Sequence, residues 1–286
     1  MAQNSPHSSI PRIYRRTELL AAGWHGSMFT AAVRSGQLVR ARGGCYLAPD
    51  TAADVVTAVR IGGRLACVSA LAARGAFVRA VDMPHVHLER SQSRLRSTAV
   101  PVRMHWRGLA RRPHPAAACV EAFDAVIQAI ECQAPRDAVA TVDSALHLGL
   151  IREDELDELF AHVSQRKKSL RSLVDGRAEA GTETLVRLML RGLGADTDIQ
   201  VKIGGVGRVD LVVNGWLVIE CDSREFHSSW EAQRADRRRD QKLAALGYVV
   251  YRPIAEDILF HPEDVVAALK GLLGCAKRRN SGSAAL

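Results

Sequence analysis

Two apolar runs that flank Asn214-Gly215 place the strongest constraint on how this chain folds. Residues 209–213 and 216–221 are both short, apolar and typical of buried strands. An Asn-Gly pair between two such runs favours a tight turn, because both residues tolerate a positive φ angle. The sequence therefore predicts a β-hairpin in the last third of the chain.

Helical and strand-like patterns surround this hairpin. Residues 228–231 (Ser-Ser-Trp-Glu) are a capping-box signature, and Gly247 is a natural end for the helix that they open. The other predicted elements are a helix at 182–191, a strand at 248–252 and a helix at 262–273. Helices and strands in this order are typical of an α/β layer fold, and we expect one domain over residues 166–275.

Acidic side chains occur in these apolar runs, where burial makes them costly. Asp210 lies inside the first run, and Glu220 and Asp222 end the second. A buried carboxylate without a partner costs several kcal/mol, so each acid calls for a compensating group. Phosphodiester hydrolysis can use one or two magnesium ions, which prefer hard oxygen ligands. Together with Glu183 on the preceding helix, these acids form a candidate catalytic cluster.

The length of the hairpin loop decides whether the acids can act together. Side chains alternate along a strand, so Glu220 and Asp222 share one face. A two-residue turn pairs Asp210 with Ile219 and directs Glu220 to the opposite face. A three-residue loop or a bulge sets Asp210 opposite Glu220, and the catalytic hypothesis predicts such an irregularity. The alternative is an edge hairpin whose solvated acids pair with Arg208.

Four motifs in chain order carry a resemblance to a nuclease family. They are Arg208-Val-Asp-Leu-Val-Val, Glu220-Cys-Asp-Ser-Arg-Glu-Phe-His227, Arg234-x-Asp-Arg-Arg-Arg-Asp240 and Leu246-Gly-Tyr-Val-Val-Tyr-Arg252. Over residues 179–273 the chain resembles the endonuclease-like domains related to very short patch repair (Vsr) nucleases, within the PD-(D/E)XK superfamily. The resemblance implies a restriction-endonuclease-like C-terminal domain that cleaves nucleic acid.

The same resemblance implies roles for individual residues. Asp210 and Glu220 would be the metal ligands, binding Mg2+ or, as a substitute, Mn2+. Glu183 would be a further acidic contributor to the catalytic site. His227 would stand near the scissile phosphate, as a general acid/base or to position water.

The sequence departs from the superfamily pattern at one catalytic position. Asp222 stands where the superfamily has a lysine, although related domains of this branch often carry aspartate there. Ser223 stands where a glycine usually follows. The group that activates water is therefore open, and the candidates are Lys202, Lys242 and His227.

Several arginines lie on the helix that follows the acidic cluster. Arg234 and Arg238 are four residues apart, so they share a helix face and could grip a phosphate, with Arg237 nearby. Asp236 and Asp240 could hold some of these arginines in place. The alternative is a solvated, salt-bridged helix face without contact to nucleic acid.

The first fifty residues have the outline of a DNA-binding module. Helical patterns at 17–22 and 27–35 precede two strand-like runs at 38–41 and 45–48. Two helices followed by a glycine-tipped hairpin predict a winged helix-turn-helix over residues 11–50. Arg34, Arg40 and Arg42 would then contact phosphates of DNA.

Three short motifs carry a second resemblance. They are Thr17-Glu-Leu-Leu-Ala-Ala-Gly23, Val33-Arg-Ser-Gly-Gln-Leu-Val-Arg40 and Gly43-Gly-Cys-Tyr-Leu-Ala-Pro49. They resemble the winged helix of AbiEi-type antitoxins and related regulators, which commonly binds DNA. The alternative is a small structural cap that uses the same apolar pattern.

Charge and composition fit a partner that is a polyanion. The net charge is +8 and the isoelectric point is near 9.5, which favours nucleic acid or an anionic membrane. No apolar run reaches the length of about 18 residues that a transmembrane helix needs, and the N-terminus lacks the apolar core of a signal peptide.

The six cysteines form no CxxC pair, which favours a reducing cytoplasm over a zinc ribbon or disulfide framework. His85 and His87 alternate along a strand-like run and could bind a metal, but no third ligand is obvious.

These patterns together predict an α/β protein with three parts. A winged helix-turn-helix (11–50) and a mixed α/β middle region (51–165) precede the restriction-endonuclease-like domain (166–275). We expect a cytoplasmic, magnesium-dependent DNA endonuclease of repair, processing or defence, with RNA as an alternative substrate, no membrane partner and an oligomeric state that the sequence leaves open. The alternative is a non-enzymatic DNA-binding regulator or antitoxin whose nuclease-like domain has decayed.

Overall fold

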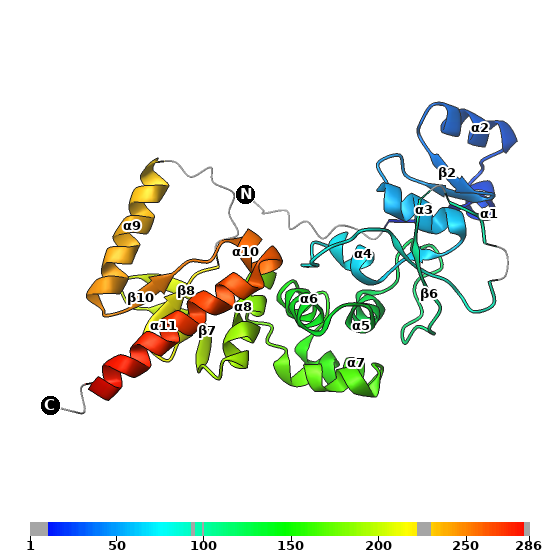
Figure 1. The fold of residues 1–286 in the computed structure, drawn as a ribbon. Coiled ribbons are helices and arrows are strands. Elements are labelled where there is room, and N and C mark those ends of the chain that lie inside the picture. Colours follow the sequence, from blue (N-terminus) through cyan, green and yellow to red (C-terminus); the bar gives the residue numbers. More distant parts are fainter. Residues whose placement is uncertain (1–10, 93–94, 99, 222–229, 283–286) are drawn as a thin grey trace. The chain divides into compact units, whose positions relative to one another are not determined.

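The structure is a computed structural model that describes residues 11–92, 95–98, 100–221 and 230–282. The chain folds into two compact units, Met1–Ser172 and Leu173–Leu286 (Figure 1). Residues 11–50 and 51–165, which the sequence separates, both lie in the first unit. Within the described part of the chain, every helix is too short or too polar to cross a membrane.

Residues 11–50 form the predicted helices and hairpin in the predicted order. The elements are β1 (Tyr14–Arg15), α1 (Arg16–Ala21), α2 (Gly26–Arg34), β2 (Val39–Arg42) and β3 (Cys45–Leu47). The three strands make an antiparallel sheet in the order β1-β3-β2. Phe29 of α2 stacks on Tyr46 of β3 with the ring centroids 5.4 Å apart, so aromatic contact holds the helix on the sheet.

This segment packs closely on the residues that follow it. The N–H of Ile13 donates to the carbonyl oxygen of Ala116 at 2.7 Å. Gly62, which ends α3 (Ala53–Ile61), has a φ angle of 110°, and the guanidinium of Arg42 lies where a Cβ at this position would be. Only glycine satisfies both conditions, so Gly62 lets the hairpin and α3 approach each other.

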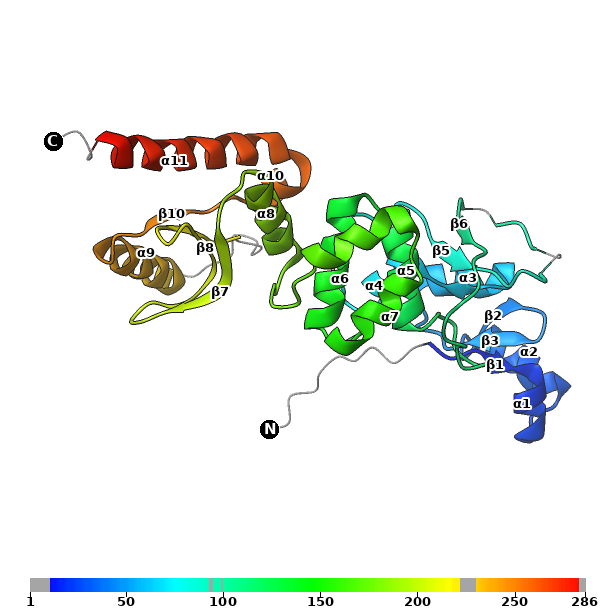
Figure 2. The same ribbon diagram turned by 90° about the horizontal axis from the view of Figure 1, so that it is seen from below.

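The middle of the first unit is a small sheet with helices around it. β4 (Arg64–Leu65) runs antiparallel to β5 (His85–His87), and β6 (Arg103–His105) runs parallel to β5 on its other side. The remaining elements are α4 (Cys67–Ala72), α5 (Ala122–Cys132), α6 (Pro135–His147), η1 (Glu153–Glu155), α7 (Leu156–Ala161) and η2 (Gln165–Leu173) (Figure 2). The predicted mixed α/β character of this region is confirmed.

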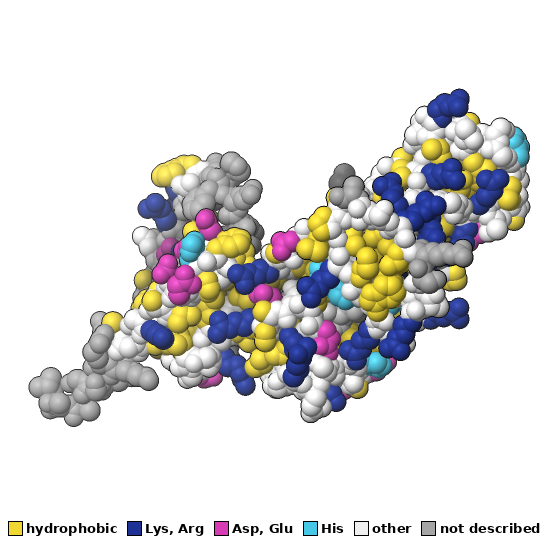
Figure 3. All heavy atoms as spheres, turned by 45° about the vertical axis from the view of Figure 1, so that its right-hand side comes forward, with side chains coloured by type: hydrophobic (Ala, Val, Ile, Leu, Met, Phe, Trp, Pro, Cys, Tyr) yellow, Lys and Arg dark blue, Asp and Glu magenta, His cyan; other side chains and the backbone are white. Residues whose placement is uncertain are grey.

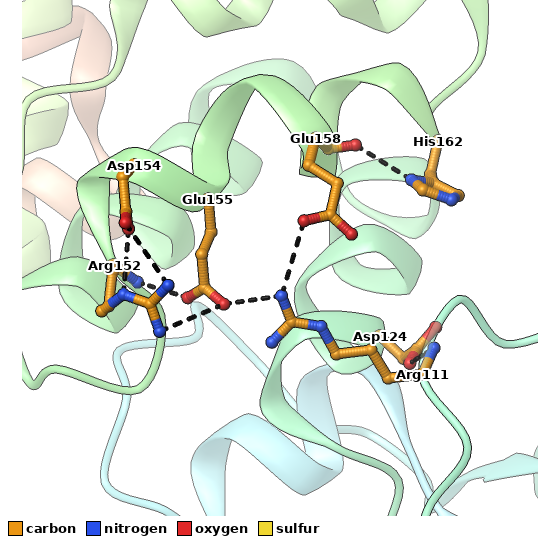
Figure 4. A network of polar contacts seen from close by, with 7 residues as sticks. All are labelled: Arg111, Asp124, Arg152, Asp154, Glu155, Glu158 and His162. Carbon is orange, nitrogen blue, oxygen red and sulfur yellow. Dashed lines mark hydrogen bonds and ion pairs between the residues drawn. The ribbon is translucent and has the colours of Figure 1, made fainter.

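A network of ion pairs ties the segment before α5 to the start of α7. Asp124 accepts the backbone N–H groups of Ala110 and Arg111 at 2.7 and 2.9 Å. The Arg111 guanidinium lies over the ring of Phe123 and forms an ion pair of 2.6 Å with Glu155, whose side chain is only 7% exposed (Figure 4). Because Glu155 is nearly buried, Arg111 supplies the charge that this carboxylate needs.

The second unit is a four-stranded sheet between helices. Its elements are α8 (Gly181–Gly192), β7 (Thr197–Ile203), β8 (Gly207–Val213), β9 (Leu217–Ile219), α9 (Trp230–Ala245), β10 (Val249–Tyr251), α10 (Ala255–Phe260) and α11 (Pro262–Gly282). The strand order is β10-β9-β8-β7, with β10 parallel to β9 and the other pairs antiparallel. Figures 1 and 2 show α9 on one side of this sheet and α11 on the other.

The core of this unit explains the position of α9. Leu243 of α9 is fully buried against a cluster of valines from β8 and β9, which includes Val209 and Val218. The α/β layer fold expected from the sequence is confirmed. The sequence missed β7, whose residues alternate between apolar and polar types, and α10.

Removal of the Arg111 side chain should destabilise the first unit. In Arg111→Ala, the buried Glu155 carboxylate loses its closest cation, and we expect a loss of about 1–3 kcal/mol in the free energy of unfolding. Arg152→Ala is the matched control, because the exposed Arg152 side chain lies farther from Glu155, at 3.6 Å, and should matter less. Urea titrations followed by circular dichroism measure both variants; an equal loss in both would contradict this role of Arg111.

Candidate active site

The loop between β8 and β9 has one residue more than a two-residue turn. Asn214 and Gly215 have φ angles of 49° and 74°, as an Asn-Gly turn requires, and the N–H of Trp216 donates to the carbonyl oxygen of Val213 at 3.1 Å. The strands nevertheless pair Val213 with Leu217, so Trp216 is an extra residue. The irregularity that the catalytic hypothesis predicts is therefore present.

This register brings the acids of the two strands together. Leu211 pairs with Ile219, and one further step along the same register sets Asp210 opposite Glu220. Oδ2 of Asp210 accepts the backbone N–H of Cys221 at 2.8 Å. Burial raises the pKa of Asp210, and the negative charge of Glu220 raises it further, although the Cys221 hydrogen bond opposes both effects.

Glu183 reaches the same region from the first turn of α8. Its carboxylate accepts the N–H groups of Glu179 and Ala180 at 3.2 and 3.0 Å, and the side-chain amide of Gln200 at 2.7 Å. The residue is only 4% exposed. Burial and then the charge of Asp210 raise the pKa of Glu183 to about 7, and the three hydrogen bonds only partly offset this rise.

Glu220 has a different electrostatic environment. Its Oε1 lies 2.7 Å from Nη2 of Arg239 on α9, and its Oε2 accepts Nε and Nη2 of Arg252 at 2.9 and 2.6 Å. Arg252 also donates to Asp240 at 2.8 Å, and this hydrogen bond lowers the pKa of Asp240. Glu220 is thus held by two guanidinium groups, whereas no ion pair joins Asp210 or Glu183 to a cation among the described residues.

The oxygen donors of these carboxylates suit a hard divalent cation, but the carboxylates do not form a complete coordination sphere. Glu183 is buried and Asp210 is half-buried, and the two carboxylates repel each other and offer oxygen donors, which is the situation that Mg2+ or Mn2+ relieves. Among the described residues, however, Glu183, Asp210 and Glu220 do not bring three ligand atoms within 4.8 Å of one another. Two further predicted site residues, Asp222 and His227, lie outside the described residues.

The structure places the two candidate lysines on different elements. Nζ of Lys242 on α9 donates to the carbonyl oxygen of Gly205 at 3.0 Å, in the turn between β7 and β8. Lys202 of β7 pairs with Arg208, which is two residues from Asp210 along β8. Their role in water activation stays a prediction.

The predicted DNA-binding arginines are accessible. Arg34 and Arg40 are exposed and Arg42 is half-buried in the first unit, and the α9 residues Arg234, Arg237 and Arg238 are exposed in the second. The sequence suggested that Asp240 holds some of these arginines in place. In the structure Asp240 instead forms its ion pair with Arg252.

A hollow of about 550 Å³ in the first unit adds two arginines to those that the sequence indicates. Arg40 and Arg42 of β2, Arg60 of α3 and Arg96 line it, and none of them forms an ion pair with a described residue. Lys and Arg side chains are numerous on the visible face of this unit (Figure 3). Sequence reasoning missed Arg60 and Arg96 because they come from separate segments.

The raised pKa of Glu183 should make the stability of the metal-free protein fall with rising pH. Between the ordinary value of 4.5 and about 7, the folded state holds a proton that the unfolded state has released. The free energy of unfolding therefore decreases over this window by up to roughly 3 kcal/mol. In Glu183→Gln the side chain stays neutral, so this decrease should become much smaller, leaving the part that comes from Asp210; urea titrations at pH 4.5 to 7.5 in EDTA measure it. An unchanged pH dependence in the variant would show that Glu183 ionises normally.

Comparison with known proteins agrees with the fold of the second unit. Residues 183–273 match the family model REase_MTES_1575, a restriction-endonuclease-like family. The chain is also 30% identical over 257 residues to the uncharacterized proteins MT2308 and Rv2248 of Mycobacterium tuberculosis strains CDC 1551 / Oshkosh and ATCC 25618 / H37Rv. Each alignment covers 83% of this chain and 93% of the relative. The chain therefore belongs to the family of these mycobacterial proteins, and its C-terminal domain is restriction-endonuclease-like.

Proposed function

We propose that this protein is a metal-dependent DNA endonuclease that hydrolyses phosphodiester bonds. The restriction-endonuclease-like match of residues 183–273 supports a nuclease. The observation that carries the proposal is the extra residue Trp216, because the resulting register sets Asp210 opposite Glu220 and leaves Asp210 close to the charge of Glu183. A regular two-residue turn would have separated these acids.

In this proposal Asp210 and Glu220 hold the metal, and Glu183 completes the acidic site. A bound Mg2+ or Mn2+ would supply Lewis acidity and lower the pKa of a water molecule. Glu220 already contacts Arg239 and Arg252, so it can serve as a ligand only if it shares its oxygens or exchanges partners. The released guanidinium groups would then be available for the phosphate.

Water activation has three proposed candidates. Lys202 lies in β7, and Lys242 of α9 already donates to the carbonyl oxygen of Gly205. Asp222 and His227, which lie outside the described residues, come two and seven residues after Glu220 in the chain. We favour His227 as the group that assists proton transfer, with Asp222 as an additional acid.

DNA binding is proposed for the first unit. The helix–helix–hairpin order of residues 11–50 supports a winged helix-turn-helix, and the sequence motifs of this segment resemble those of AbiEi-type modules. Arg34, Arg40 and Arg42 would contact phosphates, and the neighbouring Arg60 and Arg96 extend the same basic hollow. The α9 residues Arg234, Arg237 and Arg238 would hold the strand near the acids.

One observation favours a second function. Both oxygens of Glu220 contact arginines, an arrangement that a decayed nuclease could keep as a structural ion pair. The protein would then be a non-enzymatic DNA-binding regulator or antitoxin. Such a regulator binds DNA equally well in EDTA, whereas a nuclease site binds better, or turns over, when a divalent cation offsets its acids.

The first test of these alternatives is plasmid cleavage. We expect the purified protein to nick supercoiled DNA with Mg2+ or Mn2+, to be inactive in EDTA, and to lose at least about 100-fold in rate in Asp210→Asn, since a metal ligand becomes a weaker neutral donor. Asp198→Asn is the matched control, because Asp198 is exposed on the neighbouring strand β7. Absence of cleavage by the wild-type protein under every metal condition, with duplex binding intact in Asp210→Asn, would favour the regulator.

A second test addresses the basic hollow. Each phosphate contact that is lost should reduce the magnitude of the slope of log affinity against log salt concentration by about 0.9. The double variant Arg40→Ala/Arg96→Ala should therefore reduce it by about 2. Arg136→Ala on α6 removes an equally exposed charge outside the hollow and should leave the slope closer to the wild-type value. Fluorescence anisotropy with a labelled duplex measures the slopes. Equal slopes in all three proteins would exclude the hollow as a DNA contact.

A further inference from the structure

Four side chains with metal-binding atoms meet in the first unit, far in sequence from the carboxylates. They are Cys67 at the start of α4, His85 in β5, His105 in β6 and Cys132 at the end of α5. One ligand atom from each lies within 4.8 Å of all the others. Cys67 and His85 are buried, and His105 and Cys132 are half-buried, so the cluster is mostly closed to solvent.

The separations within the cluster match a tetrahedral site. Nε2 of His105 lies 3.2 Å from Nδ1 of His85, and Sγ of Cys132 lies 3.9 Å from the same nitrogen. In a tetrahedral zinc site the ordinary zinc–nitrogen and zinc–sulfur bond lengths place two nitrogens roughly 3.3 Å apart and a nitrogen and a sulfur roughly 3.6 Å apart. The observed separations lie close to both values.

We propose that Cys67, His85, His105 and Cys132 bind one Zn2+ ion as a structural site. Two sulfur and two imidazole ligands are a set that suits zinc and disfavours magnesium, which prefers oxygen. On binding, the two thiols release two protons to solvent, and the two histidines donate lone pairs as neutral imidazoles. Two thiolates balance the charge of Zn2+, so the filled site is neutral and suited to burial.

Neighbouring polar groups hold the proposed ligands in place. The backbone N–H of Cys67 donates to Oε1 of the buried Gln128 at 3.0 Å, and that of His85 donates to Oγ of the buried Ser69 at 2.9 Å. Cys67 has a φ angle of 52°, which costs energy in a residue other than glycine. The surrounding structure thus maintains an unfavourable backbone conformation at a ligand position, as functional sites often do.

The site would attach a short edge strand to the rest of the first unit. β6 has only three residues, two of them exposed, and it lies at the edge of the sheet beside the buried β5. A strand this short makes few contacts of its own. His105, the least exposed residue of β6, would attach this strand through the metal to α4 and α5. We therefore expect zinc to contribute to the stability of the first unit rather than to catalysis.

His87 is not part of this site. Its side chain lies on the same strand as His85, but its Nδ1 is 3.5 Å from the amide nitrogen of Gln128, and among the described residues it belongs to no cluster of ligand atoms. Both His85 and His87 are buried. The proposed site therefore takes His85 from this pair and its other three ligands, Cys67, His105 and Cys132, from other elements.

Metal analysis of the untagged full-length protein, purified with a reductant and without chelator, tests the proposal. We expect about one zinc per chain by inductively coupled plasma mass spectrometry, and less than a tenth of that in Cys132→Ser and His105→Asn. Cys45→Ser is the matched control, because Cys45 is a half-buried cysteine of the same unit outside the cluster, and it should keep its zinc. Stripping zinc should lower the melting temperature of the wild type by several degrees, with little effect on the ligand variants.

Two further results decide the matter if a ligand variant fails to fold. Reconstitution of the stripped wild-type protein with Co2+ should give the visible absorption of a tetrahedral sulfur–nitrogen site, and Zn2+ but not Mg2+ should displace it. Wild-type protein with no zinc and no cobalt spectrum would overturn the proposal, as would a Cys67–Cys132 disulfide in intact-mass spectra of the reductant-treated protein. Zinc content is measured directly on the protein, so it decides this proposal whether or not the protein cleaves DNA.

Discussion

The position of a single residue, Trp216, determines which side chains of β8 and β9 face each other. The Asn-Gly turn alone would pair Val213 with Trp216, but the observed pairing is with Leu217. Side chains alternate along strands, so a shift of one residue changes the partner of every side chain on β9. The proximity of Asp210 to Glu220, and hence any shared metal, depends on this shift. The local turn and the longer-range pairing are therefore separate constraints on the same hairpin.

Charge divides the acids of the second unit into two kinds. Glu220 and Asp240 have arginine partners, whereas the buried Glu183 and the half-buried Asp210 have their charges close together and their pKa values raised. The arginine-bound pair stabilises the fold at neutral pH, while the uncompensated pair makes it less stable unless a proton or a cation is bound. A site of purely structural value would gain nothing from the second pair, and this difference is the physical reason to favour a cation-binding function.

Local patterns in the sequence predict the hairpin and most helices of the second unit, and the structure confirms those elements; the role of the acids stays a prediction. They are predictable because caps, turns and alternation act over a few residues. The arginine contacts of Glu220 were missed because Arg239 and Arg252 come from α9 and the residue after β10, and only the folded sheet brings them together. The Cys/His cluster was missed for the same reason, since each ligand stands on a different element and no short spacing motif reveals it.

Two metals of opposite chemical preference would occupy different units of this chain, and this affects how chelation experiments are interpreted. EDTA removes magnesium from an oxygen site quickly, but it can also extract zinc from the Cys/His cluster and so weaken the first unit, which carries the proposed DNA contacts. Loss of cleavage in EDTA therefore does not by itself assign a metal to Asp210. Recovery of cleavage with magnesium alone supports that assignment, because Mg2+ cannot refill a site of two thiolates and two imidazoles.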